Sequence, residues 1–398
     1  MTTRHSFLRV ATPLAMLAIV ASACTSGGAS SPSSAAASQA AASQAASTGA
    51  SAAAESQAAS ADPMAALATA AKAEGGLTTI ALPHDWCNYG EVLTSFTSKY
   101  GIPINELTPD AGSGDEVNAI KANKDNKGPQ APDVIDVGLS FGPQAKTDGL
   151  IQPYKVATWD DIPATAKDAD GYWYGDYYGV LAFETNTTVV SNAPKDWADL
   201  LDASHKSQVA LAGDPRVSNQ AIQAVYAAAL ANGGSLDNAQ PGLDFFKKLN
   251  DQGNLVATIA KPGTIDQGAT PITIRWTYNA LAHRDSANGN PPIDVTVPAT
   301  GRFAGVYVQA ISAFAPHPNA AKLWMEYLYS DEGQNLWLKG YCNPIRYDAL
   351  VAKNAVPSDI AAKLPDTKGA VFPSLDQLNK ATDLITKNWD KVVGLNIK

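Results

Sequence analysis

Short apolar segments alternate with amphipathic segments along most of this chain of 398 residues. Residues 77–82 are apolar with β-branched residues in the middle, which is typical of a buried strand, and Pro83 ends the ladder. Apolar residues then repeat at helical spacing, which predicts a helix over residues 91–100. Strands that alternate with helices predict an α/β fold with a mostly parallel sheet.

The same alternation continues to the C-terminus, and a second α/β unit begins near residue 180. Further strands are predicted over residues 102–107, 133–137, 180–183, 209–212, 272–276, 293–297 and 306–313. Further helices are predicted over residues 64–72, 113–120, 144–148, 197–201, 221–231, 243–249, 319–329 and 375–389, with another after Ser330. Ser113 opens a capping-box sequence, so we expect its side chain to cap its helix.

The loops that follow these strands carry side chains able to contact a ligand. Residues 84–89, His-Asp-Trp-Cys-Asn-Tyr, lie between the first strand and its helix. In open α/β sheets, ligands bind at the carboxyl ends of strands, where such loops gather. We therefore expect the following residues at one site: His84, Asp85, Trp86, Asn88, Ser113, Asp136, Tyr178, Glu184, Arg216, Ser218, Asn219, Trp276, Tyr278 and Tyr307.

Several of these side chains also have a purely structural interpretation. Asp136 could cap the following helix, and Arg216 could pair only with Asp214. Trp276 could be a core residue, and the aromatic segment 172–178 could be surface packing. Three histidines outside these loops are expected at the surface, namely His205, His283 and His317.

Residues 1–23 have the pattern of a signal peptide, with two arginines before an uncharged apolar run that ends in Ala-Ser-Ala. Small residues directly before Cys24 favour its lipidation, and simple secretion after cleavage near Ala23 is the alternative. Residues 24–63 are almost entirely small and polar, so we predict a disordered tether. The body would then lie outside the cytoplasm, anchored to the cell membrane on its periplasmic or cell-wall side.

Charge and cysteine content restrict the partners. Removal of the signal peptide leaves 27 basic and 38 acidic side chains, a net charge of −11. An acidic body without a basic run is a poor nucleic-acid binder, and it repels anionic lipid, so membrane contact should come through the anchor alone. With Cys24 lipidated, Cys87 and Cys342 are an even pair in an oxidising compartment, and we predict a disulfide between them. Two buried free thiols are the alternative.

The sequence lacks the motifs of common catalytic classes. It contains no Gly-x-Ser-x-Gly elbow, no His-Glu-x-x-His, no phosphate-binding glycine-rich loop and no metal-ligand Cys/His spacing. We therefore expect no catalytic residues and no cofactor or metal. The rival classes are a secreted enzyme of unknown class and a surface adhesin, although the body shows neither internal repeats nor a β-rich pattern.

Several segments carry a family resemblance: Ala-Lys-Ala-Glu-Gly-Gly-Leu-Thr-Thr-Ile at 71–80, Ala-Pro-Asp-Val at 131–134, Gly-Leu-Ile-Gln-Pro-Tyr at 149–154, Trp-Ala-Asp-Leu-Leu at 197–201, Pro-Asn-Ala-Ala-Lys at 318–322 and Ser-Asp-Glu-Gly-Gln at 330–334. Their order, after a cysteine and a Ser/Ala tether, resembles the extracellular solute-binding proteins of bacterial ABC importers. The resemblance covers about residues 64–398. It points to the type II branch, whose members take polyamines, thiamine, ferric ion or phosphonates.

The resemblance implies a two-lobed type II periplasmic-binding-protein fold with two hinge crossings, near residues 178–183 and 304–309. The first lobe would comprise residues 64–179 and 307–398, and the second residues 180–306. A small-molecule ligand would bind between the lobes, and closure about the hinge would follow from its affinity for both. We expect a monomer that docks, when closed, on the permease subunits of an ABC importer.

The expected cleft residues favour an organic cation. Acidic and aromatic side chains together suit a desolvated amine, so a polyamine-like ligand is the leading prediction. Arg216, Arg275 and Arg346, together with two helix N-termini, argue for a phosphonate or another oxyanion. Thiamine and ferric ion are further alternatives. Related iron binders carry paired tyrosines where this chain has Trp-Thr-Tyr at 276–278.

Overall fold

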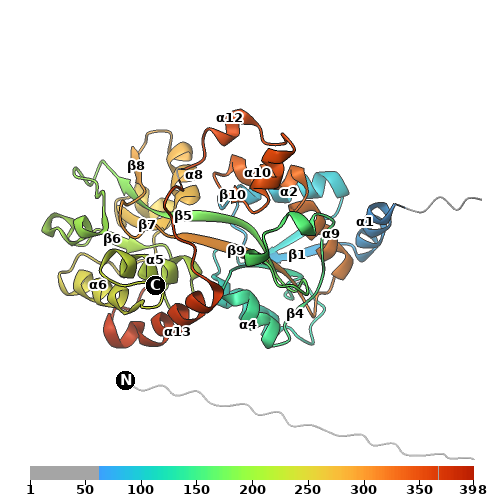
Figure 1. The fold of residues 1–398 in the computed structure, drawn as a ribbon, viewed down its shortest axis with the longest axis horizontal. Coiled ribbons are helices and arrows are strands. Elements are labelled where there is room, and N and C mark those ends of the chain that lie inside the picture. Colours follow the sequence, from blue (N-terminus) through green and yellow to red (C-terminus); the bar gives the residue numbers. More distant parts are fainter. Residues whose placement is uncertain (1–61, 366) are drawn as a thin grey trace, which may run out of the picture. The chain divides into compact units, whose positions relative to one another are not determined.

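Two long strands, β5 (Tyr174–Asn186) and β9 (Ala304–Ser312), run through the middle of the fold in the computed structural model (Figure 1). The structure describes residues 62–365 and 367–398, so the predicted signal peptide, Cys24 and nearly all of the predicted tether lie outside the described residues. β5 pairs with β9 over its first half and with β7 (Ile272–Trp276) over its second half. One strand therefore belongs to two parts of the sheet.

The predicted elements occur in the predicted order, mostly within a few residues of the predicted bounds, although the segment predicted as a helix at 197–201 is a 3-10 helix. The other strands are β1 (Leu77–Ile80), β2 (Ile104–Leu107), β3 (Val134–Gly138), β4 (Ile151–Gln152), β6 (Val209–Leu211), β8 (Ile293–Thr296) and β10 (Asn343–Pro344). The α-helices are α1 (Pro63–Glu74), α2 (Tyr89–Tyr100), α3 (Ser113–Ala122), α4 (Phe141–Thr147), α5 (Asn219–Ala231), α6 (Gln240–Asp251), α7 (Pro262–Asp266), α8 (Thr277–Ala287), α9 (Pro318–Leu328), α10 (Asp331–Lys339), α11 (Tyr347–Ala352), α12 (Ser358–Ala361) and α13 (Leu375–Val392). Six of these elements were not predicted: β4, β10, α7, α8, α11 and α12.

The prediction of a mostly parallel sheet is wrong. Among the described residues, the main sheet has eight strands, with the central order β3–β9–β5–β7–β6, and β6–β7 is its one parallel pair of named strands. β1 and β2 form a separate parallel pair. β5 and β9 run antiparallel to each other and to the other strands beside them. Local hydrophobic pattern indicates which segments are strands, but the direction of two long strands is set by long-range packing.

β5 and β9 coincide with the segments where the resemblance implies the hinge crossings. Packing does not divide the described body further, so the lobe boundaries stay a prediction. α13, near the end of the chain, packs against α5 and α6 (Figure 1). Its buried face includes Trp389, whose ring contacts that of Phe246 on α6 with centroids 5.8 Å apart. In the described ranges, no helix combines the length and apolar character that a membrane crossing needs.

The predicted disulfide between Cys87 and Cys342 is confirmed. The two Cα atoms are 5.6 Å apart, and both side chains are fully buried. The bond joins the loop between β1 and α2 to the segment before β10. The loop that carries Trp86 is therefore covalently attached to the C-terminal part of the chain.

Close packing of α5 against α6 gives a testable prediction at Gly242. A Cβ atom at this position would lie 1.9 Å from the carbonyl oxygen of Val225, so Gly242→Ala should force the two helices apart. We expect the free energy of unfolding to fall by about 1 to 3 kcal/mol, measured by urea denaturation. The control is Gly263→Ala in α7, where a Cβ atom would have no neighbour within 4 Å. Equal stability of the two variants would contradict this packing.

Candidate functional site

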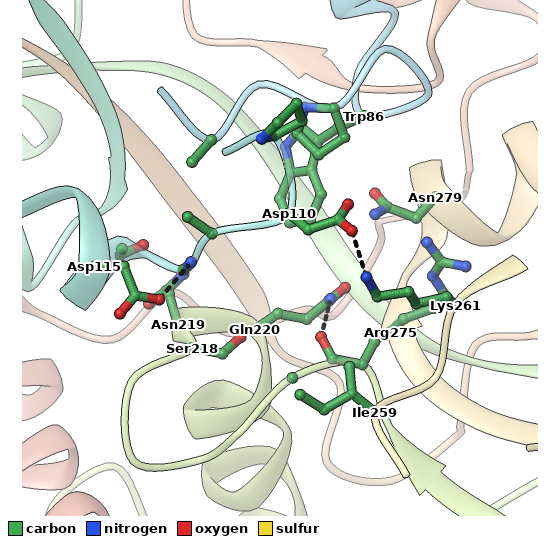
Figure 2. Close-up of a pocket in the computed structure, with 18 of the residues that line it drawn as sticks. Trp86, Asp110, Asp115, Ser218, Asn219, Gln220, Ile259, Lys261, Arg275 and Asn279 are labelled. Carbon is green, nitrogen blue, oxygen red and sulfur yellow. Dashed lines mark hydrogen bonds and ion pairs between the residues drawn. The ribbon is translucent and has the colours of Figure 1, made fainter. Parts of the chain in front are cut away.

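Three strand-to-helix loops meet at a cavity of about 290 Å³: those between β1 and α2, between β2 and α3, and between β6 and α5 (Figure 2). The third loop contacts the first turn of α3, because the N–H of Gly114 donates to the carbonyl oxygen of Val217 at 3.3 Å. Lys261 approaches from a fourth segment and forms an ion pair with Asp110. The cavity is therefore enclosed by segments that are far apart in the sequence.

Half of the residues predicted for the site line this cavity: Asp85, Trp86, Ser113, Asp136, Ser218, Asn219 and Tyr307. His84 and Asn88 instead line a second groove of about 370 Å³, which Asp85 also borders. His84 is exposed and pairs with Glu106 at 2.8 Å.

The other predicted residues lie away from the cavity lining. Tyr178 packs on Phe372 instead, with ring centroids 5.3 Å apart. Arg216 pairs with Asp214 at 2.7 Å, in agreement with its structural interpretation, and also reaches Asp390. Its charge is therefore held within the protein.

Trp276, Tyr278 and Glu184 are fully buried behind the cavity. Trp276 and Tyr278 stack with ring centroids 6.2 Å apart, in agreement with the structural interpretation of Trp276. Their chain neighbours Arg275 and Asn279 line the cavity in their place. Arg275 and Trp276 are successive residues of β7, and their side chains point to opposite faces of the sheet. Tyr278 and Asn279 are in the first turn of α8, where successive side chains point in different directions around the helix.

The expectation that three histidines lie at the surface is wrong for two of them. His205 and His283 are buried, and His317 is half-buried. Each finds a polar partner inside the protein: Gln208 for His205, Glu184 for His283 and Asp133 for His317. Such partners come from packing and leave no local signal around a histidine.

Trp86 is held rigidly at the edge of the cavity. Its ring centroid lies 5.4 Å from that of Tyr278 and 5.3 Å from that of Tyr307, both in edge-to-face contact. Its indole N–H donates to the hydroxyl of Tyr177 at 2.6 Å. The polar group of the indole is thus used inside the protein, and the ring supplies an apolar wall.

Ser113 does not cap α3, contrary to the prediction. Gly112 is the N-cap residue, and its N–H donates to the carboxylate of Asp115 at 3.1 Å. The Ser113 hydroxyl instead accepts from the N–H of Gly138 at 3.1 Å. The helix therefore starts where it was predicted, but its N-cap is Gly112, one residue before the Ser113 that the capping-box pattern indicated.

The N-terminus of α5 opens onto the cavity. Ser218 is its N-cap residue, yet its side chain makes no capping hydrogen bond. The next residue, Asn219, is only 2% exposed, and its side-chain N–H₂ makes no hydrogen bond of normal length, with only a weaker interaction with the hydroxyl of Tyr307. Its side-chain oxygen accepts from Gln223 at 2.8 Å. The first turn of a helix also presents N–H groups without partners inside the helix, and its dipole favours negative charge.

Arg275 is the buried basic group of the site. It is 5% exposed, lines the cavity and pairs with Glu184 at 3.1 Å through Nη1. Its Nε–H is buried without a hydrogen-bond partner.

Two residues that line the cavity, Lys261 and Asn279, were not predicted from the sequence. Lys261 follows no predicted strand, so the strand-end rule gave no signal for it.

Three buried carboxyl groups lie at or behind the cavity: Asp136 and Glu116, which line it, and Asp176, which does not. The Oδ2 atom of Asp136 accepts from the hydroxyls of Tyr89 and Tyr177, both at 2.7 Å. Burial raises the pKa of Asp136 to about 7. Burial, followed by the charge of Asp136, also raises the pKa values of Glu116 and Asp176. These groups therefore keep their protons to a higher pH than ordinary carboxyls do. Within the described ranges, no three His, Cys, Asp or Glu side chains are grouped so that they could hold a metal ion.

Comparison with known proteins shows the family. A family model of bacterial extracellular solute-binding proteins matches residues 130–374, more than half of the chain. A Haemophilus influenzae protein without an assigned function is 29% identical over 298 residues, which cover 69% of this chain and 79% of that protein. A Salmonella typhimurium periplasmic protein named for 2-aminoethylphosphonate binding is 26% identical over 306 residues, 74% of this chain and 84% of that protein.

Two solved structures share the fold. AfuA of Actinobacillus pleuropneumoniae, with fructose 6-phosphate bound, is 22% identical with a TM-score of 0.63, over 80% of this chain and 98% of that one. Iron-bound HitA of Pseudomonas aeruginosa is 16% identical with a TM-score of 0.58, over 80% and 99%. These likenesses confirm the α/β periplasmic-binding-protein fold. The chain therefore belongs to the bacterial extracellular solute-binding proteins, a non-enzymatic family that binds solutes for ABC import.

Proposed function

We propose that this protein captures a small solute with a phosphonate- or phosphate-like group and presents it to the permease of an ABC importer. The proposal depends mainly on one observation: the open N-terminus of α5, the buried amide of Asn219 and the buried Arg275 line the same cavity. Helix N-termini and guanidinium groups are the usual protein groups that bind oxyanions.

The acidic side chains fit this proposal better than the predicted polyamine-like ligand. In and behind the cavity, Asp110 pairs with Lys261, Asp214 with Arg216 and Glu184 with Arg275. Their negative charge is neutralised within the protein and is not available to a cation. Burial raises the pKa of Asp136 to about 7, so this carboxyl carries less negative charge near neutral pH than an ordinary aspartate.

An organic cation is the second candidate, and Asp85 is the observation that favours it. This side chain is exposed at the cavity beside Trp86 and has no ion pair within the described residues. A zwitterion such as 2-aminoethylphosphonate would place its amine near Asp85 and its phosphonate near Asn219 and Arg275. The Salmonella relative is named for this compound. Thiamine and ferric ion remain predictions from the resemblance alone.

The mode of action extends the same proposal. The solute would contact both predicted lobes, and closure about β5 and β9 would form the surface that the permease binds. The protein would act as a monomer, held to the membrane by lipid on Cys24 and by the tether. These features belong to the proposal together with the ligand class.

Thermal unfolding with a panel of solutes tests the ligand class. We expect 2-aminoethylphosphonate, inorganic phosphate or a hexose phosphate to raise Tm, because a ligand at 100 times its Kd stabilises the native state by about 2.7 kcal/mol. Ethylamine is the matched control, since it keeps the amine and lacks the phosphonate. Spermidine and ferric ion test the alternatives.

A pair of variants links the panel to the cavity. Asn219→Ala removes the buried amide and should abolish most of the shift, whereas Asn388→Ala on α13, away from the cavity, should leave it unchanged. A rise in Tm with spermidine and none with any oxyanion would refute the proposed ligand class.

A further inference from the structure

On the side away from the cavity, Arg275 joins a cluster of charged side chains whose other members are not part of the proposed ligand site. The cluster consists of Arg275, Glu184, His283 and Asp266. In the ladder between β5 and β7, Arg275 lies opposite Ala182, and Glu184 lies opposite Thr273. Arg275 and Glu184 are therefore diagonal neighbours on one face of the sheet. Nη1 of Arg275 donates to Oε2 of Glu184 at 3.1 Å. Of these two residues, Arg275 lines the cavity, and Figure 2 shows it beside Lys261 and Asn279.

His283, on α8, completes the cluster from the other side. Its Nδ1 atom is hydrogen-bonded to Oε1 of Glu184, and its Nε2 atom lies 3.1 Å from a carboxylate oxygen of Asp266. Because both ring nitrogens face carboxylates, the imidazole satisfies both contacts as a donor only when it is protonated. Burial lowers the pKa of His283, but the hydrogen bond and charge of Glu184, with the charge of Asp266, raise it above its ordinary value.

The charged groups around His283 come from every element packed against α8. β5 contributes Glu184, β7 contributes Arg275, and the end of α7 contributes Asp266. On β8, Asp294 is already paired with Lys195 at 2.9 Å. On α8 itself, Arg284 and Asp285 pair with each other at 2.9 Å. Glu184, Arg275 and Asp266 are thus the charges that respond to His283.

We propose that Glu184 is a positioning residue for Arg275, and that protonation of His283 sets how strongly Arg275 attracts an anionic solute. This inference rests on the proposed oxyanion ligand. With His283 protonated, two positive and two negative groups balance within the cluster, and Arg275 attracts an anion at the cavity. With His283 neutral, the cluster has a net charge of −1, and Glu184 offsets the charge of Arg275. The solute should bind more tightly as the pH falls through the pKa of His283, and by linkage the bound solute should raise that pKa.

The test compares binding of 2-aminoethylphosphonate by calorimetry across about pH 6 to 9, the range in which a histidine with a raised pKa titrates. As the pH rises over this range, the affinity of wild type should fall about five- to tenfold more than the affinity of His283→Gln. A coupling of this size between two sites is ordinary. The phosphonate also titrates in this range, but its titration affects wild type and His283→Gln equally, so it does not contribute to the difference between them. Glu184→Gln should also remove the pH-dependent difference, although Gln can still accept from Arg275.

The matched control is His205→Gln, a buried histidine whose ring is hydrogen-bonded to Gln208 and which does not line the cavity. This variant should keep the wild-type pH profile. If His283→Gln also keeps that profile while the solute still binds, the inference is overturned and the proposed ligand class stands. If no oxyanion binds at any pH, the proposed function fails, and the inference fails with it.

A second measurement needs no ligand. An NMR titration of the His283 imidazole should show a higher pKa in Arg275→Gln than in wild type, because the positive charge of Arg275 lowers that pKa. Glu184→Gln should shift the His283 pKa downward. A His283 pKa that does not respond to Arg275→Gln would show that the two charges are independent, and would overturn the inference even in a protein that binds oxyanions.

Discussion

Replacing both Cys87 and Cys342 by alanine is expected to lower the free energy of unfolding by about 4 kcal/mol. The bond closes a loop of 255 residues, and a cross-link of this length removes much of the conformational freedom of the unfolded chain. Both sulfurs are also fully buried, so truncation removes packing as well. Guanidinium denaturation of the two proteins measures the difference.

Reduction provides the internal control for this prediction. Wild type treated with a thiol reductant should lose a similar amount of stability, whereas the double variant should not respond to the reductant. Because the disulfide holds the loop that carries Trp86, solute binding should weaken in the same samples. An equal unfolding free energy for oxidised and reduced wild type would contradict the structural role of the bond.

Asp136→Asn is expected to make the protein more stable than wild type above about pH 7. Burial raises the pKa of Asp136 from the usual aspartate value to about 7, so the native state keeps a proton that the unfolded state has released. The stability from this group is complete below about pH 4 and is lost as the pH rises toward 7. Each pH unit in this window is worth about 1.4 kcal/mol, so the total reaches roughly 4 kcal/mol.

Asparagine imitates the protonated carboxyl group and needs no proton. Its side-chain oxygen can still accept from the hydroxyls of Tyr89 and Tyr177. Thermal unfolding between about pH 4 and pH 8 should therefore show a shallower decline in the variant. Part of the decline should remain, because burial and the charge of Asp136 also raise the pKa of Asp176. The exposed Asp359→Asn is the control, and a wild-type slope in Asp136→Asn would rule out a protonated Asp136 in the native state.

The site was predictable to the level of the loop and often not to the level of the side chain. The rule that ligands bind where strands end located the loops around Trp86 and Ser218. The same rule selected Trp276 and Tyr278, whereas Arg275 and Asn279 face the cavity. For an apolar or aromatic residue at the end of a strand, the sequence does not show which face of the sheet its side chain occupies. That is decided only when the strand pairs with its neighbours.

Charge at the site was the least predictable property. The acids in the loops suggested a cation, because an unpaired carboxylate attracts one. In the folded chain, Asp110 and Glu184 each meet a basic residue from a distant segment, Lys261 and Arg275 respectively. The pairing depends on long-range contacts, so a count of acidic residues overstates the negative charge that a solute meets.

The sequence by itself determined the order of most strands and helices, the α/β class, the family and the pairing of Cys87 with Cys342. These properties depend on local periodicity, on turn residues, and on the number of cysteines in an oxidising compartment. Only the tertiary structure decided the antiparallel course of β5 and β9, the burial of His283, and the choice of Arg275 over Trp276 at the cavity. The physical reason is that register, burial and charge pairing arise between segments far apart in the chain, and the free energy that selects them appears only when those segments pack together.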